Sequence, residues 1–167
     1  MFNRELNVKN TMLWLFAAVF TVVGCNQEGK KNAGSNGSIH AENAGESPKA
    51  QFQDPRVSAV YHHYLHVKDA LVQADSKEAQ LGSAALKTAL KQINSPEGAA
   101  VAEKITKTAD LAAQRASFNS LTSEIEAVFK KSSVTRGEVF KQYCPMANEG
   151  EGGYWFSNDR TIRNPYY

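Results

Sequence analysis

The residue types best suited to bind a metal ion lie near the end of the chain, where positions 143–147 read Tyr-Cys-Pro-Met-Ala. Thiolate and thioether sulfurs are soft, polarizable donors that select Cu(I) over hard cations. Pro145 fixes its own φ and favours an extended conformation for Cys144. If Met146 is extended too, residues i and i+2 point to the same side of the backbone. The spacing therefore predicts a soft-metal site formed by Cys144 and Met146.

The same tail also has a purely structural interpretation. Cys144 would then be a small buried hydrophobe and Met146 a gap filler, with the nearby aromatic residues fixing the tail to the rest of the fold. A nucleophilic cysteine with a histidine base is a third alternative. The sequence shows no recognisable orienting residue or oxyanion loop for it, so we expect no enzymatic activity.

Three of the four histidines lie in the sequence Tyr-His-His-Tyr-Leu-His at positions 61–66. On a helix, His62 and His66 are i and i+4 and lie one above the other. Two imidazoles at this spacing can bind a divalent ion or Cu(II). The alternative is that they are ordinary polar-face residues, because two ligands from one helix make only half a site.

The elements that must position these residues follow a leader. Residues 12–23 carry no charge, and this run is too short for a stable span, which needs about 20 apolar residues. Residues 22–25, Val-Val-Gly-Cys, resemble the lipobox of bacterial lipoproteins. We therefore expect a signal peptide over residues 1–24, lipidation of Cys25 and anchoring of the protein in the cell envelope, on the periplasm-facing side or at the outer membrane. An ordinary secretory signal with an incidental cysteine is the alternative.

The rest of the chain divides into three parts. Residues 25–53 are rich in Gly, Asn, Ser, Lys and Glu, a composition that predicts a disordered tether after the lipidated cysteine. Residues 54–131 show helical periodicity, and residues 132–167 form the Cys-Pro-Met and aromatic tail. We expect an all-α fold, an up-and-down bundle of about four helices with an irregular, hairpin-like tail packed on it.

Four helix starts are marked by capping residues. Asp54 precedes proline, Asp75 precedes Glu78 by three residues as in a capping box, Ser95 precedes proline, and Asp110 opens the last helix. Apolar residues follow at three- and four-residue steps. The residues expected to face inward are Val57, Val60, Tyr61, Tyr64, Val67, Leu71, Ala79, Ser83, Leu86, Leu90, Ile93, Val101, Ile105, Leu111, Phe118, Leu121, Ile125, Val128 and Phe129.

Charge excludes one class of partner. The net charge is +2 at pH 7, and no basic stripe runs along any predicted helix. Nucleic-acid binding is therefore not expected as the main role.

The aromatic residues after the Gly-rich turn give the tail a second possible role. Residues 139–143 and 154–157 are expected to pair as a short hairpin around this turn. Trp155 or Tyr154 would then shield a bound ion from water. Alternatively, the aromatic tail docks onto an efflux or envelope protein with no metal involved, and the candidate partner-binding residues are Tyr154, Trp155, Phe156 and Tyr166.

Several of these segments together resemble a known family. Residues 143–147, 154–157 (Tyr-Trp-Phe-Ser) and 162–166 (Ile-Arg-Asn-Pro-Tyr) are similar to the C-terminal signature of the bacterial envelope family called domain of unknown function 3347. Residues 64–72 (Tyr-Leu-His-Val-Lys-Asp-Ala-Leu-Val) and 115–118 (Arg-Ala-Ser-Phe) resemble its first-helix and last-helix segments. The resemblance spans roughly residues 55–167.

This resemblance implies a role in metal handling. Family members occur as small lipoproteins and beside adaptor subunits of heavy-metal efflux systems, which implies Cu(I) or Ag(I) handling in the periplasm and a heavy-metal efflux adaptor as a partner. The residues implied as metal candidates are Cys144 and Met146. The family pattern usually continues beyond the Asn-Pro-Tyr segment with a further Met and Cys, which do not occur in the given sequence up to Tyr167. Either the reading frame is truncated here, or this copy has lost half of the soft-metal site. A histidine would then be needed for tight binding of Cu(I).

Overall fold

The computed structural model describes residues 49–167, which form four helices and two small antiparallel sheets. In chain order the elements are β1 (Gln51–Phe52), α1 (Pro55–Val72), α2 (Ser76–Gln92), α3 (Pro96–Thr106), α4 (Leu111–Phe129), β2 (Val134–Arg136), β3 (Phe140–Cys144), the short 3₁₀ helix η1 (Asn148–Gly150) and β4 (Gly153–Ser157). The fold is mostly helical and not all-α, which corrects the expected fold class.

The helices begin where the capping residues predict. Asp54 accepts a hydrogen bond from the backbone N–H of Arg56, and Asp75 accepts one from Glu78. Asp110 caps α4 in the same way, whereas Ser95 makes no side-chain cap bond before α3. Each aspartate satisfies a backbone donor that the first turn of its helix leaves without an intrahelical acceptor.

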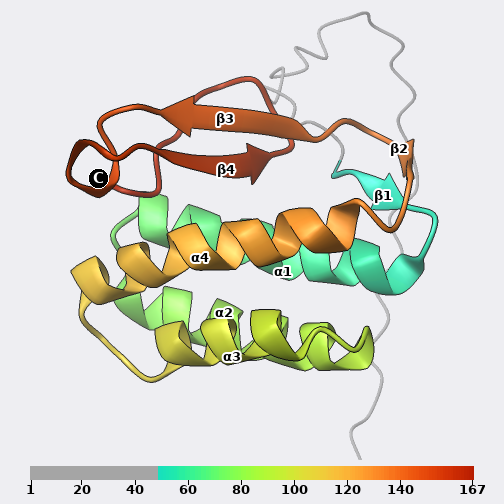
Figure 1. The fold of residues 1–167 in the computed structure, drawn as a ribbon, viewed down its shortest axis with the longest axis horizontal. Helices are drawn as coiled ribbons and strands as arrows, with labels where there is room; N and C mark the ends of the chain where they lie inside the picture. Colours follow the sequence, from blue (N-terminus) through green and yellow to red (C-terminus); the bar gives the residue numbers. More distant parts are fainter. Residues whose placement is uncertain (1–48) are drawn as a thin grey trace, which may run out of the picture. The chain divides into compact units, whose positions relative to one another are not determined.

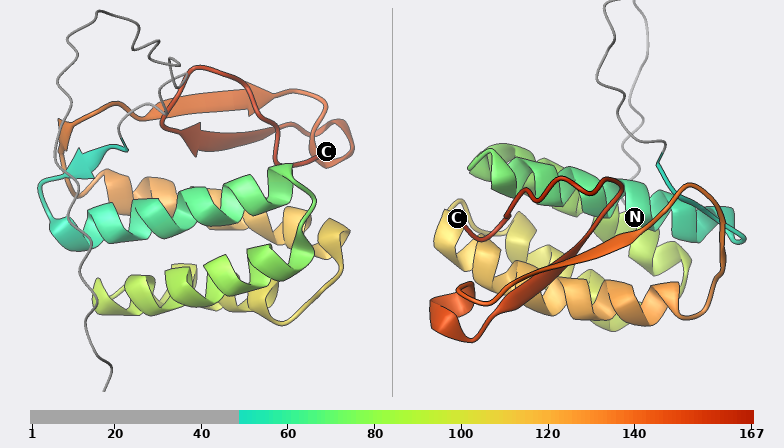
Figure 2. Two further views of the ribbon diagram at one scale, coloured as in Figure 1. Left: turned by 180° about the vertical axis from the view of Figure 1, so that it is seen from behind. Right: turned by 90° about the horizontal axis from the view of Figure 1, so that it is seen from above.

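The described residues pack in three layers. α1 and α4 form the middle layer, α2 and α3 lie on one side of it, and the β3–β4 hairpin lies on the other side (Figures 1 and 2). Consecutive helices run antiparallel and are joined by short connections, as in an up-and-down bundle.

The core confirms the predicted helical stripes. Val60, Tyr61, Tyr64, Val67 and Leu71 of α1 have exposed fractions of 0%. On the other helices, the buried members of the predicted set are Ala79, Ser83, Leu86, Leu90, Ile105, Phe118, Leu121, Ile125 and Val128. Ile93, Val101, Leu111 and Phe129 are half-buried at the edge of the same cluster.

The start of the folded region differs from the sequence prediction. Ala50 and Phe52 belong to the predicted tether, but both are buried in the core, and β1 pairs with β2. The Phe52 ring stacks on Phe129 with a centroid separation of 4.8 Å and meets Tyr61 edge-on. A large aromatic side chain buries roughly 150–250 Å², so Phe52 fixes this end of the polar segment to the core.

The predicted hairpin of the tail is present. Cys144 pairs with Gly153, Gln142 with Trp155, and Phe140 with Ser157, so the register is regular along the whole ladder. The predicted leader, the predicted lipidation site Cys25 and most of the predicted tether lie outside the described residues. Among residues 49–167, no helix is both long enough and apolar enough to cross a membrane.

Candidate functional site

The turn between β3 and β4 holds the predicted sulfur ligands. It passes through four residues with positive φ, including Gly152 at +87°. The Asn148 side-chain amide donates to the Gly152 carbonyl at 2.8 Å, and the Tyr143 ring lies directly over this glycine, so that a Cβ there would meet the phenol oxygen at 2.3 Å. The turn is therefore closed by its own contacts, which fixes the residues at its ends.

Cys144 and Met146 lie at the same end of the hairpin but in different environments. Cys144 is the last residue of β3 and is half-buried against the core cluster. Met146 is 72% exposed. The N–H of Ala147 donates to the carbonyl of Cys144 at 3.4 Å, so the chain turns here and Met146 is not extended. The two side chains would share one strand face only if Met146 were extended, so this condition is not met. Both residues nevertheless belong to a single turn.

The aromatic residues predicted to bind a partner are mostly interior. Trp155, Phe156 and Tyr166 have exposed fractions of 0%, 5% and 8%. Phe156 packs on Tyr64 and Phe129, and Tyr166 packs on Phe118. Their burial does not fit a partner surface and corrects that prediction, because residues already buried against their own fold present no area to another protein.

Tyr154 is half-buried and held in a polar cluster. Its hydroxyl donates to Glu126 Oε2 at 2.9 Å, and the Lys141 ammonium lies 3.9 Å from the centroid of its ring. Lys141 Nζ also reaches Glu126 Oε1 at 3.0 Å, and this hydrogen bond, with the one from Tyr154, lowers the pKa of the Glu126 carboxyl. These contacts join the hairpin to the exposed side of α4.

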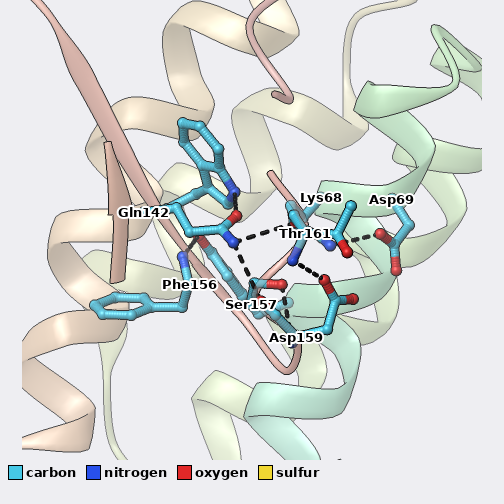
Figure 3. Close-up of polar contacts among 9 residues, drawn as sticks. Lys68, Asp69, Gln142, Phe156, Ser157, Asp159 and Thr161 are labelled. Atoms are coloured by element: carbon cyan, nitrogen blue, oxygen red, sulfur yellow. Dashed lines mark hydrogen bonds and ion pairs between the residues drawn. The ribbon is translucent and has the colours of Figure 1, made fainter. Parts of the chain in front are cut away.

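A buried amide network, which no sequence pattern predicted, holds the tail over the hairpin (Figure 3). The indole N–H of Trp155 donates to Gln142 Oε1 at 2.7 Å. The amide nitrogen of Gln142 donates in turn to the carbonyls of Asp159 and Thr161, at 3.1 and 3.2 Å. Because every polar atom of the Gln142 side chain is used, the residues after β4 are fixed across the hairpin face that carries Trp155.

A lysine on the inward side of α1 belongs to the same region. Lys68 is 2% exposed, and its ammonium meets Asp69 Oδ1 at 2.6 Å beside the segment that carries Thr161 (Figure 3). The sequence contained the signal, since Lys68 lies four residues after Tyr64 and three before Leu71, both of which face inward. The resulting ion pair is a structural contact between neighbouring residues of one helix.

Arg115 of α4 fixes the end of the chain. Its guanidinium donates to the carbonyls of Pro165 and Leu71, at 3.0 and 3.2 Å. The Tyr167 hydroxyl donates to the Met146 carbonyl. The last residues therefore lie next to the turn that holds the two sulfur side chains.

The histidines are not gathered with these sulfur atoms into one centre. His62 is exposed, whereas His66 Nε2 lies 2.6 Å from Glu78 Oε1 and joins α1 to α2. Partial burial, with the neighbouring imidazoles of His62 and His66, lowers the pKa of His63. Within residues 49–167, no three His, Cys, Asp or Glu side chains lie close enough together to hold a metal ion. In the structure His66 is engaged in a hydrogen bond between α1 and α2.

One comparison with known proteins gives a match. A family model described as protein of unknown function (DUF3347) matches residues 60–137. The matched region runs from α1 through β2 and ends before β3, so the tail that carries Cys144 and Met146 is outside it. No curated protein and no solved structure matches the chain.

Proposed function

Because residues 60–137 place this chain in the DUF3347 family, we propose that it is a non-catalytic envelope protein that binds soft metal ions. The proposed ions are Cu(I) and Ag(I), and the proposed ligands are the Cys144 thiolate and the Met146 thioether. Anchoring through a lipidated Cys25 and cooperation with a heavy-metal efflux adaptor are parts of the same proposal. They rest on the sequence patterns alone.

The observation that supports this function is the exposure of Met146. A methionine used only for packing would be buried, as Trp155, Phe156 and Tyr166 are, but the exposed fraction of Met146 is 72%. Cys144, two residues away, is only half-buried. A large exposed thioether beside a partly accessible thiol offers two soft donors to an incoming ion.

The histidines contribute less to this proposal. His66 would have to leave Glu78 before it could bind a metal. His62 does not make that contact and lies in the first half of α1. It belongs to no group of three His, Cys, Asp or Glu side chains that could hold a metal ion among residues 49–167. We therefore assign the primary ligands to the turn and regard the imidazoles as an independent and weaker site.

A titration with Ag(I) or Cu(I) tests this assignment. The titration uses the Cys25→Ser variant, in which Cys144 is the only remaining thiol. We expect Cys144→Ser and Met146→Leu each to weaken binding by about tenfold or more, since each removes one of two soft donors. His66→Gln is the matched control and should leave the affinity unchanged. Equal affinity in Cys144→Ser and the parent protein would exclude this thiol as a ligand.

A docking role without metal is the second candidate, supported by a different observation. Tyr143, Met146 and Tyr167, all near the turn, are 60%, 72% and 61% exposed. Exposed tyrosine and methionine are typical of protein interfaces. If this surface docks onto an efflux adaptor, co-purification with that adaptor should survive Cys144→Ser and be lost when Tyr143 and Tyr167 are both changed to alanine.

A further inference from the structure

β3 forms the outer edge of the hairpin. β4 lies against α1 and α4, and β3 lies beyond β4, away from the helices (Figure 1). The outer side of β4 is occupied: the N–H of Phe156 donates to the Tyr64 hydroxyl, and the carbonyl of Tyr154 accepts from Tyr166. The outer side of β3 has no such cover from the helices.

The register shows which groups of β3 point outward. Lys141 pairs with Phe156 and Tyr143 with Tyr154. In an antiparallel ladder, directly opposed residues either exchange both hydrogen bonds or direct both backbone groups away from each other. Since Phe156 and Tyr154 use their backbone groups away from β3, the N–H and C=O groups of Lys141 and Tyr143 also point away from β4.

These outward groups have no partner among the described residues. No backbone or side-chain hydrogen bond within residues 49–167 involves the main chain of Lys141 or Tyr143 on that side. Both residues are exposed, Tyr143 by 60%. An edge of this kind is a template for another strand.

We propose that the edge of β3 pairs with the same edge of a second copy of this chain. A two-fold axis through Gln142 would place Lys141 opposite Tyr143 of the second copy, and Tyr143 opposite its Lys141. Each of these two pairs can exchange both of its outward bonds, which gives about four hydrogen bonds and a continuous four-stranded sheet. The geometry is self-complementary, so a single surface meets itself.

The side chains favour a second copy over an unrelated peptide. Each Lys141 ammonium would face an exposed tyrosine ring of the other copy, as it already faces the Tyr154 ring at 3.9 Å in its own. No carboxylate or second ammonium lies directly opposite Lys141 in this register. Pro145 lacks an N–H and limits the ladder at its far end. A register centred on Lys141 would set two ammonium groups directly opposite each other, so the register about Gln142 is favoured.

Self-association through such a short edge is expected to be weak. The contact is much smaller than the ~1,200–2,000 Å² of a stable interface, so self-association is expected only at high protein concentration. The pairing is independent of the proposed metal site, because an antiparallel register sets Cys144 opposite Phe140 and not opposite a second thiol. Self-association through β3 should therefore persist in the presence of a metal chelator and a reductant, which separates this proposal from metal binding.

Amide hydrogen exchange tests the pairing at the residues concerned. The full chain with Cys25→Ser is compared at about 20 µM and about 1 mM, and the exchange of the Lys141 and Tyr143 amides is followed by NMR. We expect both amides to exchange several-fold more slowly at the higher concentration, since pairing there protects them. The backbone N–H of Gln142 points toward β4 and serves as the internal control. Its exchange rate should be the same at both concentrations.

Two substitutions at one position separate the backbone contribution from the side chain. Tyr143→Pro removes an outward N–H and leaves the β4 ladder intact, and sedimentation should show self-association weakened by about tenfold or more. Tyr143→Ala keeps the N–H and should lose less. Circular dichroism confirms folding, and Lys141→Pro replaces Tyr143→Pro if that variant unfolds. Unchanged amide exchange, equal association of the proline and alanine variants, or a protein that stays monomeric at 1 mM would overturn the proposal.

Discussion

Two tyrosines of α1 provide a matched test of how the hairpin is held to the helices. Tyr61 and Tyr64 are both 0% exposed. The Tyr64 hydroxyl accepts from the N–H of Phe156 at 3.2 Å and lies 2.9 Å from Thr122 Oγ1. The Thr122 hydroxyl donates to the Phe118 carbonyl at 3.0 Å, so Tyr64 must donate to Thr122. The Tyr61 hydroxyl, in contrast, is buried and has no hydrogen-bond partner among residues 49–167.

The perturbation is the removal of one hydroxyl at each position. Tyr64→Phe leaves the buried N–H of Phe156 without an acceptor, at a cost of roughly 1–3 kcal/mol, and we expect the free energy of unfolding to fall by about 2 kcal/mol. Tyr61→Phe removes a polar atom that is buried without compensation, so stability should be unchanged or rise by up to about 1 kcal/mol. The two variants delete the same atom, so the difference between their free energies of unfolding isolates the effect of its surroundings.

Urea denaturation followed by circular dichroism measures both changes. The slope of the transition should be the same in all three proteins, because the area exposed on unfolding hardly changes. The Phe156 amide should also exchange faster in Tyr64→Phe than in Tyr61→Phe. A loss of stability in Tyr61→Phe as large as that in Tyr64→Phe would refute the reasoning, since it would show that the lost hydroxyl and not its partners sets the cost.

Two further predictions concern the turn and the pH dependence of folding. Gly152→Ala should lower the free energy of unfolding by more than about 1 kcal/mol, because the new Cβ combines a positive φ with a clash against Tyr143. Gly150→Ala is the control, because Gly150 also has a positive φ but open space around it. It should lower the free energy of unfolding by less in the same urea experiment. Burial raises the pKa of Tyr166 and of both α1 tyrosines above the ordinary value of 10.0. Folding therefore favours the protonated phenols, so the stability they support is complete below pH 10 and decreases as the pH rises above it. Tyrosinate absorbance at 295 nm should rise together with unfolding. Titration of these phenols in a protein that stays folded would contradict this prediction.

Much of the fold could be predicted because its signals are local. The predicted capping residues Asp54, Asp75 and Asp110 all cap helices in the structure. A cap bond joins residues only two or three positions apart, so the sequence pattern is enough to predict it. The hairpin was predicted from two apolar runs around a Gly-rich turn, which is also a short-range signal. The small β1–β2 sheet joins segments more than eighty positions apart and had no such signal.

The candidate site was predicted less completely. The sequence selected Cys144 and Met146 by residue type, and the structure places them at one turn with Met146 exposed. It also selected Trp155, Phe156 and Tyr166 as a partner surface, although these side chains fill the interior. Aromatic residues have the same pattern in a sequence whether they pack inward or face a partner, so residue type alone does not distinguish the two.

The sequence by itself determined the four helices, their inward stripes and the position of the two sulfur donors beside a proline, because each follows from neighbours along the chain. Only the tertiary structure decided that Gln142 joins Trp155 to the tail, that His66 is paired with Glu78, and that β3 has β4 as its one neighbouring strand among the described residues. Those features depend on which distant elements pack together. Packing of that kind is set by the whole core, and no short stretch of sequence contains it.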